Sequence, residues 1–158
     1  VLPDVGWSGV IVLALTAHAQ AHIGKKFERR MTTKSYIARV WGVMTEPSGR
    51  VDQPIITDWP NRPKQMIDHD RGRPAQTDWQ VLDIADGMTR VRLTPKTGRS
   101  HQLRVHLLHL GHPILGDNLY AHAEALAASD RLCLHAETLG FRHPDGDAPV
   151  GFESPAPF

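Results

Sequence analysis

The sequence predicts an α+β fold, because short strand patterns outnumber helical ones along the chain. Runs of β-branched and aromatic residues alternate with turn residues, whereas apolar residues recur at helical spacing in few places. A length of 158 residues and a hydrophobic content of 41% suit one domain with its own core. No internal repeat or long linker divides the chain, and we expect residues 1–158 to form a single domain.

The first apolar run predicts a buried strand from Val10 to Leu15. Because Ala17-His18-Ala19 follows it, the run also resembles a secretion signal with its cleavage site. No Lys or Arg precedes it, which argues against export, and it is far too short to span a bilayer. Cys133 is the only cysteine and lies in an apolar run, which is typical of a reducing compartment. We therefore expect a cytoplasmic protein without a membrane partner.

A helix follows, because Ala19, Ile23 and Phe27 recur at helical spacing. Its other face is basic. The residues of this basic helix face are Lys25, Lys26, Arg29 and Arg30. The face is either an ordinary solvated surface or a phosphate-binding one. The 18 basic residues nearly balance the 17 acidic ones, so any RNA contact must rest on such local patches rather than on overall charge.

Several strands are expected after this helix. They are residues 36–43, residues 76–84 and 88–95 joined as a hairpin by Ala85-Asp86-Gly87, and two short strands at 132–136 and 138–143. Between them, residues 54–64 contain three prolines and the exposed-looking Trp59, which predicts a loop rather than a central strand.

A second helix is predicted from an N-cap at Ser100 to a stop at Gly111. It is apolar nearly all round, which indicates a buried helix, yet it carries Arg104. An unpaired buried charge costs several kcal/mol, so a carboxylate should face this arginine. The pair is either a structural ion pair or an arginine that holds a catalytic carboxylate ionised.

Four histidines crowd this helix and its end: His101, His106, His109 and His112. His109 and His112 have a workable ligand spacing, but no HExxH motif or cysteine pair accompanies them. We expect histidines that cap the helix or form hydrogen bonds in the core, and no metal site. A histidine metalloenzyme is the alternative.

Four segments together resemble the RluA-type pseudouridine synthases. They are KSYIARVWG, DWPNRPKQ, TPKTGRSHQLRVHLLHLGHPILGD and the closing run that starts at RLCLHAETLGFRHP and ends at FESPAPF. The likeness covers almost the whole chain, and DWPNRPKQ is similar to the RluA branch itself. It implies a bent mixed β-sheet with a few flanking helices, and an enzyme that isomerises uridine to pseudouridine without cofactor or metal. The implied partner is structured RNA: 23S ribosomal RNA, the tRNA anticodon stem-loop, or both. No exposed heptad indicates a protein partner, and we expect a monomer.

The resemblance also implies site residues. Asp4, followed by Ser8-Gly9, occupies the position of the family nucleophile; Arg104 is its ionic partner, and Tyr36 stacks on the flipped uracil and can help to move its C5 proton. The residues expected to bind RNA are Lys25, Lys26, Arg29, Arg30, Arg62, Lys64, Arg99 and His101.

The likeness is weakest at the first residues. The family's HRLD block reads Val1-Leu2-Pro3-Asp4 here, so the family's histidine, arginine and leucine are absent. Family members also carry strands before this block, and we expect a chain that lacks them. The alternative function is therefore a catalytically impaired remnant that still binds RNA.

Overall fold

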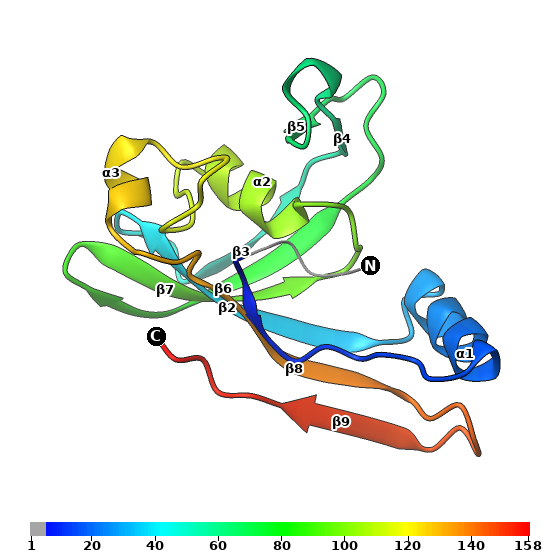
Figure 1. The fold of residues 1–158 in the computed structure, drawn as a ribbon. Helices are drawn as coiled ribbons and strands as arrows, with labels where there is room; N and C mark the ends of the chain where they lie inside the picture. The colour runs from blue at the N-terminus through cyan, green and yellow to red at the C-terminus, as the bar shows by residue number, and fades with distance from the viewer. Residues whose placement is uncertain (1–5) are drawn as a thin grey trace.

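The computed structural model describes residues 6–158, which build a bent, mixed sheet with helices on one side (Figure 1). The strand order is β1-β8-β2-β7-β6-β3, and β9 also pairs with β8. Among the described strands of this sheet, only the β1–β8 pairing is parallel. The strands are β1 (Ser8–Gly9), β2 (Thr33–Trp41), β3 (Ser48–Asp52), β6 (Gln76–Ala85), β7 (Met88–Pro95), β8 (Leu134–Arg142) and β9 (Pro149–Glu153). The predicted α+β class is confirmed.

A small separate hairpin stands beyond this sheet (Figure 1). It consists of β4 (Ile55–Thr57) and β5 (Gln65–Ile67), joined through the 3-10 helix η1 (Trp59–Asn61). The segment 54–64 thus contains one short strand, but it stays outside the main sheet, as its prolines predict.

The α-helices in the described part of the chain are α1 (Ala17–Glu28), α2 (Gln102–His109) and α3 (Ala123–Ala127). They lie on the same side of the sheet, with α1 at the far end from α2 and α3 (Figure 1). The side chain of Thr16 caps α1 by accepting a hydrogen bond from the Ala19 N–H. Ile23 is buried against Leu139 and Phe141 of β8, as predicted, whereas Phe27 of the same predicted apolar face is 37% exposed. Within residues 6–158, no helix has the length and apolar character needed to cross a membrane.

The main core lies between the sheet and α2. Val40, Val91 and Leu93 of the sheet belong to one buried cluster with Leu103 and Leu107 of α2. We call the sheet face that carries this cluster the helix-covered face.

The opposite face is covered in part by the C-terminal segment. The Ser154 carbonyl hydrogen-bonds to His135, and the ring of Phe158 lies edge-on against the same histidine. Consecutive residues of β2, Ile37 and Ala38, are both buried because the sheet is covered on both faces there.

The predicted strand from Val10 to Leu15 is wrong. Gly9 is the last residue of β1, because β9 pairs with the same edge of β8 from Thr138 onward. Val10 and Val12 still pack against the Ile23 cluster, whereas Leu15 is 95% exposed. Apolar composition alone did not reveal that another strand takes the edge.

The two short strands predicted near the end are one strand, β8. Its pairing with β2 shifts at a β-bulge, since Ser35 pairs with Thr138 but Tyr36 pairs with Ala136. Glu137 is the extra residue, which explains the apparent break in the sequence pattern. Its carboxylate accepts hydrogen bonds from the Arg92 guanidinium, 3.1 and 3.3 Å away, which lowers the pKa of Glu137.

The predicted hairpin between β6 and β7 is confirmed, and its turn residues are those expected. Asp86 and Gly87 both have positive φ angles, 55° and 72°, as the tight turn between paired strands requires.

Two glycines allow a test of this fold. Gly24 lies inside α1 with open space where a Cβ would go, so Gly24→Ala should raise the free energy of unfolding by about 0.5–1 kcal/mol. Gly9 has a φ of +119°, and its Cβ would lie 2.2 Å from the Ala136 carbonyl oxygen. Gly9→Ala should therefore lower stability by more than about 1 kcal/mol. Urea unfolding followed by tryptophan fluorescence measures both, and equal stability of Gly9→Ala and the wild type would contradict the β1–β8 pairing.

Candidate active site

Helix α2 begins later than predicted, at Gln102, and Ser100 is not its N-cap. The Gln102 side chain holds the preceding turn instead. Its Oε1 accepts hydrogen bonds from the Thr97 hydroxyl at 2.7 Å and the Arg99 N–H at 3.1 Å. Its Nε2 donates to the Gln76 carbonyl at 2.9 Å. A buried glutamine thus replaces the expected serine cap, while the predicted stop at Gly111 is confirmed by its φ of 83°.

His106 fixes the other side of α2. Its Nε2 lies 2.9 Å from the Gln53 carbonyl, so this nitrogen carries the proton and Nδ1 accepts from the Thr77 hydroxyl at 2.8 Å. Burial lowers the pKa of His106, which keeps the ring neutral. The histidine therefore positions the helix.

Arg104 is buried, with 5% of its surface exposed, and a carboxylate faces it as predicted. Asp117 is fully buried, and its two oxygens accept from the guanidinium Nε at 2.9 Å and Nη2 at 2.6 Å. Asp117 also accepts hydrogen bonds from the N–H groups of Leu119 and Tyr120. This two-point contact fixes both the charge and the plane of the guanidinium.

The loop after α2 has the shape that this ion pair requires. Gly116 has a φ of 72°, and a Cβ there would lie 1.9 Å from the Arg131 carbonyl oxygen. Only glycine fits, and it turns the chain so that Asp117 points back at α2. The sequence signal was present as Leu115-Gly116-Asp117, which begins six residues after His109, the last residue of the helix, but a loop carboxylate gives no periodic pattern.

The carboxylate predicted to face Arg104 was Asp4, which lies outside the described residues. Asp117 is a functional-site residue that sequence reasoning missed. The pairing of Asp4 with Arg104 stays a prediction.

Tyr120 joins the small hairpin to this site. The Arg104 guanidinium lies over its ring, 5.1 Å from the centroid. The Tyr120 hydroxyl accepts a hydrogen bond from the Gln65 N–H at 2.8 Å and lies 2.6 Å from Nδ1 of His101. Hairpin, loop and helix therefore meet around Arg104.

Tyr36 lies on β2 with its side chain on the helix-covered face, where it packs against the cluster that includes Leu103. Burial raises the pKa of Tyr36, so its hydroxyl stays protonated near neutral pH. The ring of Trp7 lies edge-on against it, with 6.1 Å between ring centroids. The segment next to Asp4 in sequence is thus anchored beside Tyr36.

Comparison with known proteins identifies the family. Residues 4–109 match the family described as RNA pseudouridylate synthase. The chain belongs to this family. Over 156 residues it is 52% identical to the dual-specificity RNA pseudouridine synthases RluA of Yersinia pestis and Escherichia coli strain K12. The aligned region covers 98% of this chain and 76% and 71% of those relatives.

Solved structures of the family share the fold. Human RNA pseudouridylate synthase domain containing 1 superimposes with a TM-score of 0.79 at 32% identity, covering 91% of this chain and 62% of the human chain. Human RNA pseudouridylate synthase domain containing 4 superimposes with a TM-score of 0.71 at 25% identity, covering 90% and 64%. The resemblance inferred from sequence motifs is confirmed.

The basic residues expected to bind RNA in this family member fall into two groups. Lys25 of α1 and Arg29, the C-cap residue of that helix, are exposed, whereas Lys26 forms an ion pair with Asp147 at 3.1 Å. Arg30 follows the helix in a left-handed conformation, with φ 56°.

The second group surrounds the small hairpin. The Arg62 guanidinium lies 4.9 Å from the ring centroid of Trp59, which is 63% exposed. Lys64 is half-buried, and Arg99 donates to the Pro74 carbonyl. RNA binding by the two groups stays a prediction.

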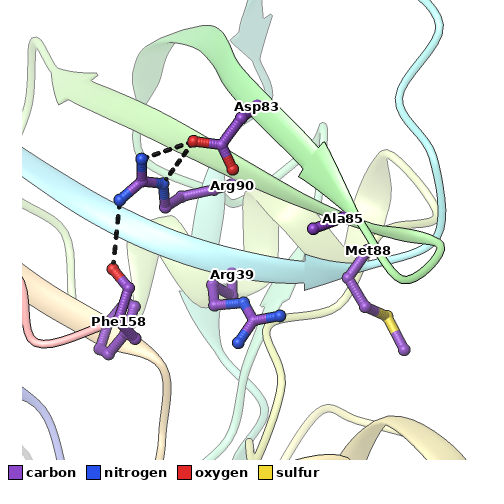
Figure 2. Close-up of a pocket in the computed structure, with 6 residues that line it drawn as sticks. All are labelled: Arg39, Asp83, Ala85, Met88, Arg90 and Phe158. Atoms are coloured by element: carbon purple, nitrogen blue, oxygen red, sulfur yellow. Dashed lines mark hydrogen bonds and ion pairs between the residues drawn. The ribbon is translucent and has the colours of Figure 1, made fainter.

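A cavity of about 260 Å³ lies on the sheet face opposite Tyr36 (Figure 2). Arg39, Arg90, Asp83 and Phe158 contribute to its walls. Arg39 and Tyr36 are an odd number of residues apart on β2, so their side chains point to opposite faces. The cavity is therefore not part of the site built around Arg104.

The histidines show no metal-binding arrangement in the part of the chain from residue 6 onward, where no group of three His, Cys, Asp or Glu could hold an ion. His112 hydrogen-bonds through Nδ1 to the Trp41 carbonyl at 2.8 Å, and His109 is exposed.

The buried ion pair can be tested through stability. Asp117→Asn should lower the free energy of unfolding by about 3–5 kcal/mol, because it leaves the buried charge of Arg104 without this carboxylate. Asp78→Asn is the matched control, since Asp78 pairs with Arg50 in a partly exposed position and should contribute less than about 1 kcal/mol. Chemical denaturation measures both. Equal losses would show that the Arg104–Asp117 pair does not organise the core.

Proposed function

We propose that this chain is an RNA pseudouridine synthase that isomerises uridine within structured RNA. The observation that carries the proposal is the buried guanidinium of Arg104 on α2, which Asp117 holds at two points. Helix α2 packs on the same sheet face as Tyr36. Family membership supplies the reaction, and this geometry supplies a fixed cation and an aromatic ring with which to perform it.

The reaction is an isomerisation with no net reagent. The bond between uracil N1 and ribose C1′ breaks, the base turns, and C5 bonds to C1′. C5 loses its proton and N1 gains one, so atoms and electrons balance without a redox partner or cofactor.

Asp4 is the proposed nucleophile, acting on the ribose either by attacking C1′ or by removing a sugar proton. Arg104 keeps that carboxylate ionised, and its fixed plane orients the carboxylate. Support comes from Trp7, three residues after Asp4, which contacts Tyr36. Further support comes from Ser8, whose hydroxyl is 2.8 Å from His135 and accepts a 2.6 Å hydrogen bond from Arg131.

Tyr36 is the proposed platform for the target base. A uridine inside folded RNA must leave its stack, which costs a few kcal/mol, and an aromatic ring recovers part of that cost. Because its pKa is raised by burial, the hydroxyl remains a neutral group that can hydrogen-bond as the C5 proton departs.

The proposed substrates are uridines in 23S ribosomal RNA and in the tRNA anticodon stem-loop. The relatives named dual-specificity RNA pseudouridine synthase support this choice. We place the protein in the cytoplasm, as a monomeric single domain that needs no obligate protein partner. The basic residues of α1 and of the small hairpin bind the RNA backbone.

The altered first residues favour one alternative function. Val1-Leu2-Pro3 replaces the family's histidine, arginine and leucine before Asp4. A chain with an impaired site would still bind RNA through its basic surfaces.

Replacement of Asp4 separates the two functions. In a tritium-release assay on a stem-loop RNA labelled at uridine C5, Asp4→Asn should abolish product and leave RNA affinity unchanged, because only the nucleophile is lost. Product from the wild type establishes the enzyme; its absence from both proteins, with RNA still bound, establishes the remnant. Equal product from both removes Asp4 from the mechanism.

Two replacements of Tyr36 distinguish stacking from proton transfer. Tyr36→Phe keeps the ring and should retain most single-turnover activity, whereas Tyr36→Ala loses about 1–3 kcal/mol of stacking and should be much slower. Single-turnover kinetics at saturating RNA measure both. Equal loss would assign the role to the hydroxyl.

A further inference from the structure

Lys34 lies on the helix-covered face close to the proposed site, and neither the family role nor the sequence patterns assign it a function. It precedes Tyr36 by two residues on β2, so the two side chains point to the same face. Leu139, directly opposite Lys34 in β8, is buried with Ile23 of α1. Lys34 therefore stands between the proposed base platform and the basic helix α1.

In the part of the chain that the structure describes, the ammonium group of Lys34 has no counter-ion. Among residues 6–158, no carboxylate lies within ion-pair distance of it, and no hydrogen bond satisfies it. Burial lowers the pKa of Lys34 without a compensating charge. By contrast, Lys26 and Lys96 each have an aspartate partner, Asp147 and Asp78. A half-buried ammonium group that has no anion beside it is a preorganised binding site for an anionic group of a ligand.

The ammonium group of Lys34 lies against a turn of the backbone. A Cβ added to Gly98, in the turn between β7 and α2, would lie 3.3 Å from the Lys34 Nζ. Gly98 is exposed and, as a glycine, places no side chain beside the ammonium. The same turn is held in place by Gln102, which accepts a hydrogen bond from the Arg99 N–H, so the ammonium lies beside a fixed segment of backbone.

We propose that Lys34 binds a backbone phosphate next to the uridine that Tyr36 receives. This inference rests on the proposed function and deepens it. RNA is the ligand that the surroundings favour, since a flipped nucleotide seated on Tyr36 carries a phosphate on each side of its ribose. The contact orients the substrate, and Lys34 takes no part in bond making or breaking.

The test measures RNA affinity separately from turnover. Lys34→Met keeps the aliphatic stem and should raise the dissociation constant for an anticodon stem-loop RNA about tenfold, as expected for one charge-assisted hydrogen bond. The slope of log affinity against log salt should fall by about one unit. Lys34→Arg should keep most of the affinity. Lys96→Met is the control, and it should change neither quantity, because Lys96 is partnered by Asp78.

A single neutral methylphosphonate, placed in turn at each phosphate flanking the target uridine, identifies the contact. At the contacted phosphate, the losses from Lys34→Met and from the methylphosphonate should not add, whereas at other positions they should. Additive losses at every flanking phosphate, or an unchanged salt slope, would overturn the proposal. So would a loss confined to the single-turnover rate at saturating RNA, which would make Lys34 an acid–base group.

Two controls separate an effect on RNA binding from an effect on folding and from a loss of turnover. The melting temperature of Lys34→Met should equal or exceed that of the wild type, because a desolvated charge is removed. Binding does not require turnover. If the wild type makes no pseudouridine, the proposed function fails, while the affinity and salt data still decide whether Lys34 binds phosphate.

Discussion

The buried ion pair between Arg104 and Asp117 is the constraint on which the rest of the site depends. A guanidinium in an apolar helix is tolerated only because a carboxylate meets it at two points, and that carboxylate is itself satisfied by two backbone N–H groups. The pair joins α2 to the following loop and, through Tyr120, to the small hairpin. Three separate segments are thereby fixed relative to one cation.

Supporting hydrogen bonds explain how a short helix can hold that cation steady. Both polar atoms of the Gln102 amide and both ring nitrogens of His106 form hydrogen bonds. The Thr77 hydroxyl of β6 bonds to both side chains. Helix α2 is therefore tied to the sheet through side chains on two of its turns. An active site needs such rigidity, since a displaced guanidinium would no longer orient its anion.

The sequence predicted the site best where the polarity of a residue conflicts with that of its neighbours in the chain. Arg104 in an apolar helix demanded a carboxylate, and the structure has one. Which carboxylate it is could not be read from the pattern, because Asp117 lies in a loop whose path depends on Gly116. The strand predicted at residues 10–15 failed for a similar reason, since composition does not reveal that β9 already occupies that edge of β8. Ser100 had the ordinary chemistry of a cap, but the side chain of Gln102 took over the turn. The preferences of neighbouring residues predicted the helices and strands. Where those elements begin and end depended on contacts with residues elsewhere in the chain.

The parallel pairing of β1 with β8 has a consequence for the order of events during synthesis. Ser8 and His135 are hydrogen-bonded although 127 positions separate them in the chain. Such a contact closes a very long loop and can form only after the later strand exists. On the ribosome, the segment that leads into β1 must therefore wait for most of the chain to emerge. A nascent chain would have its helices and hairpins before it had the residues that follow Asp4 in place, so the site would be assembled last.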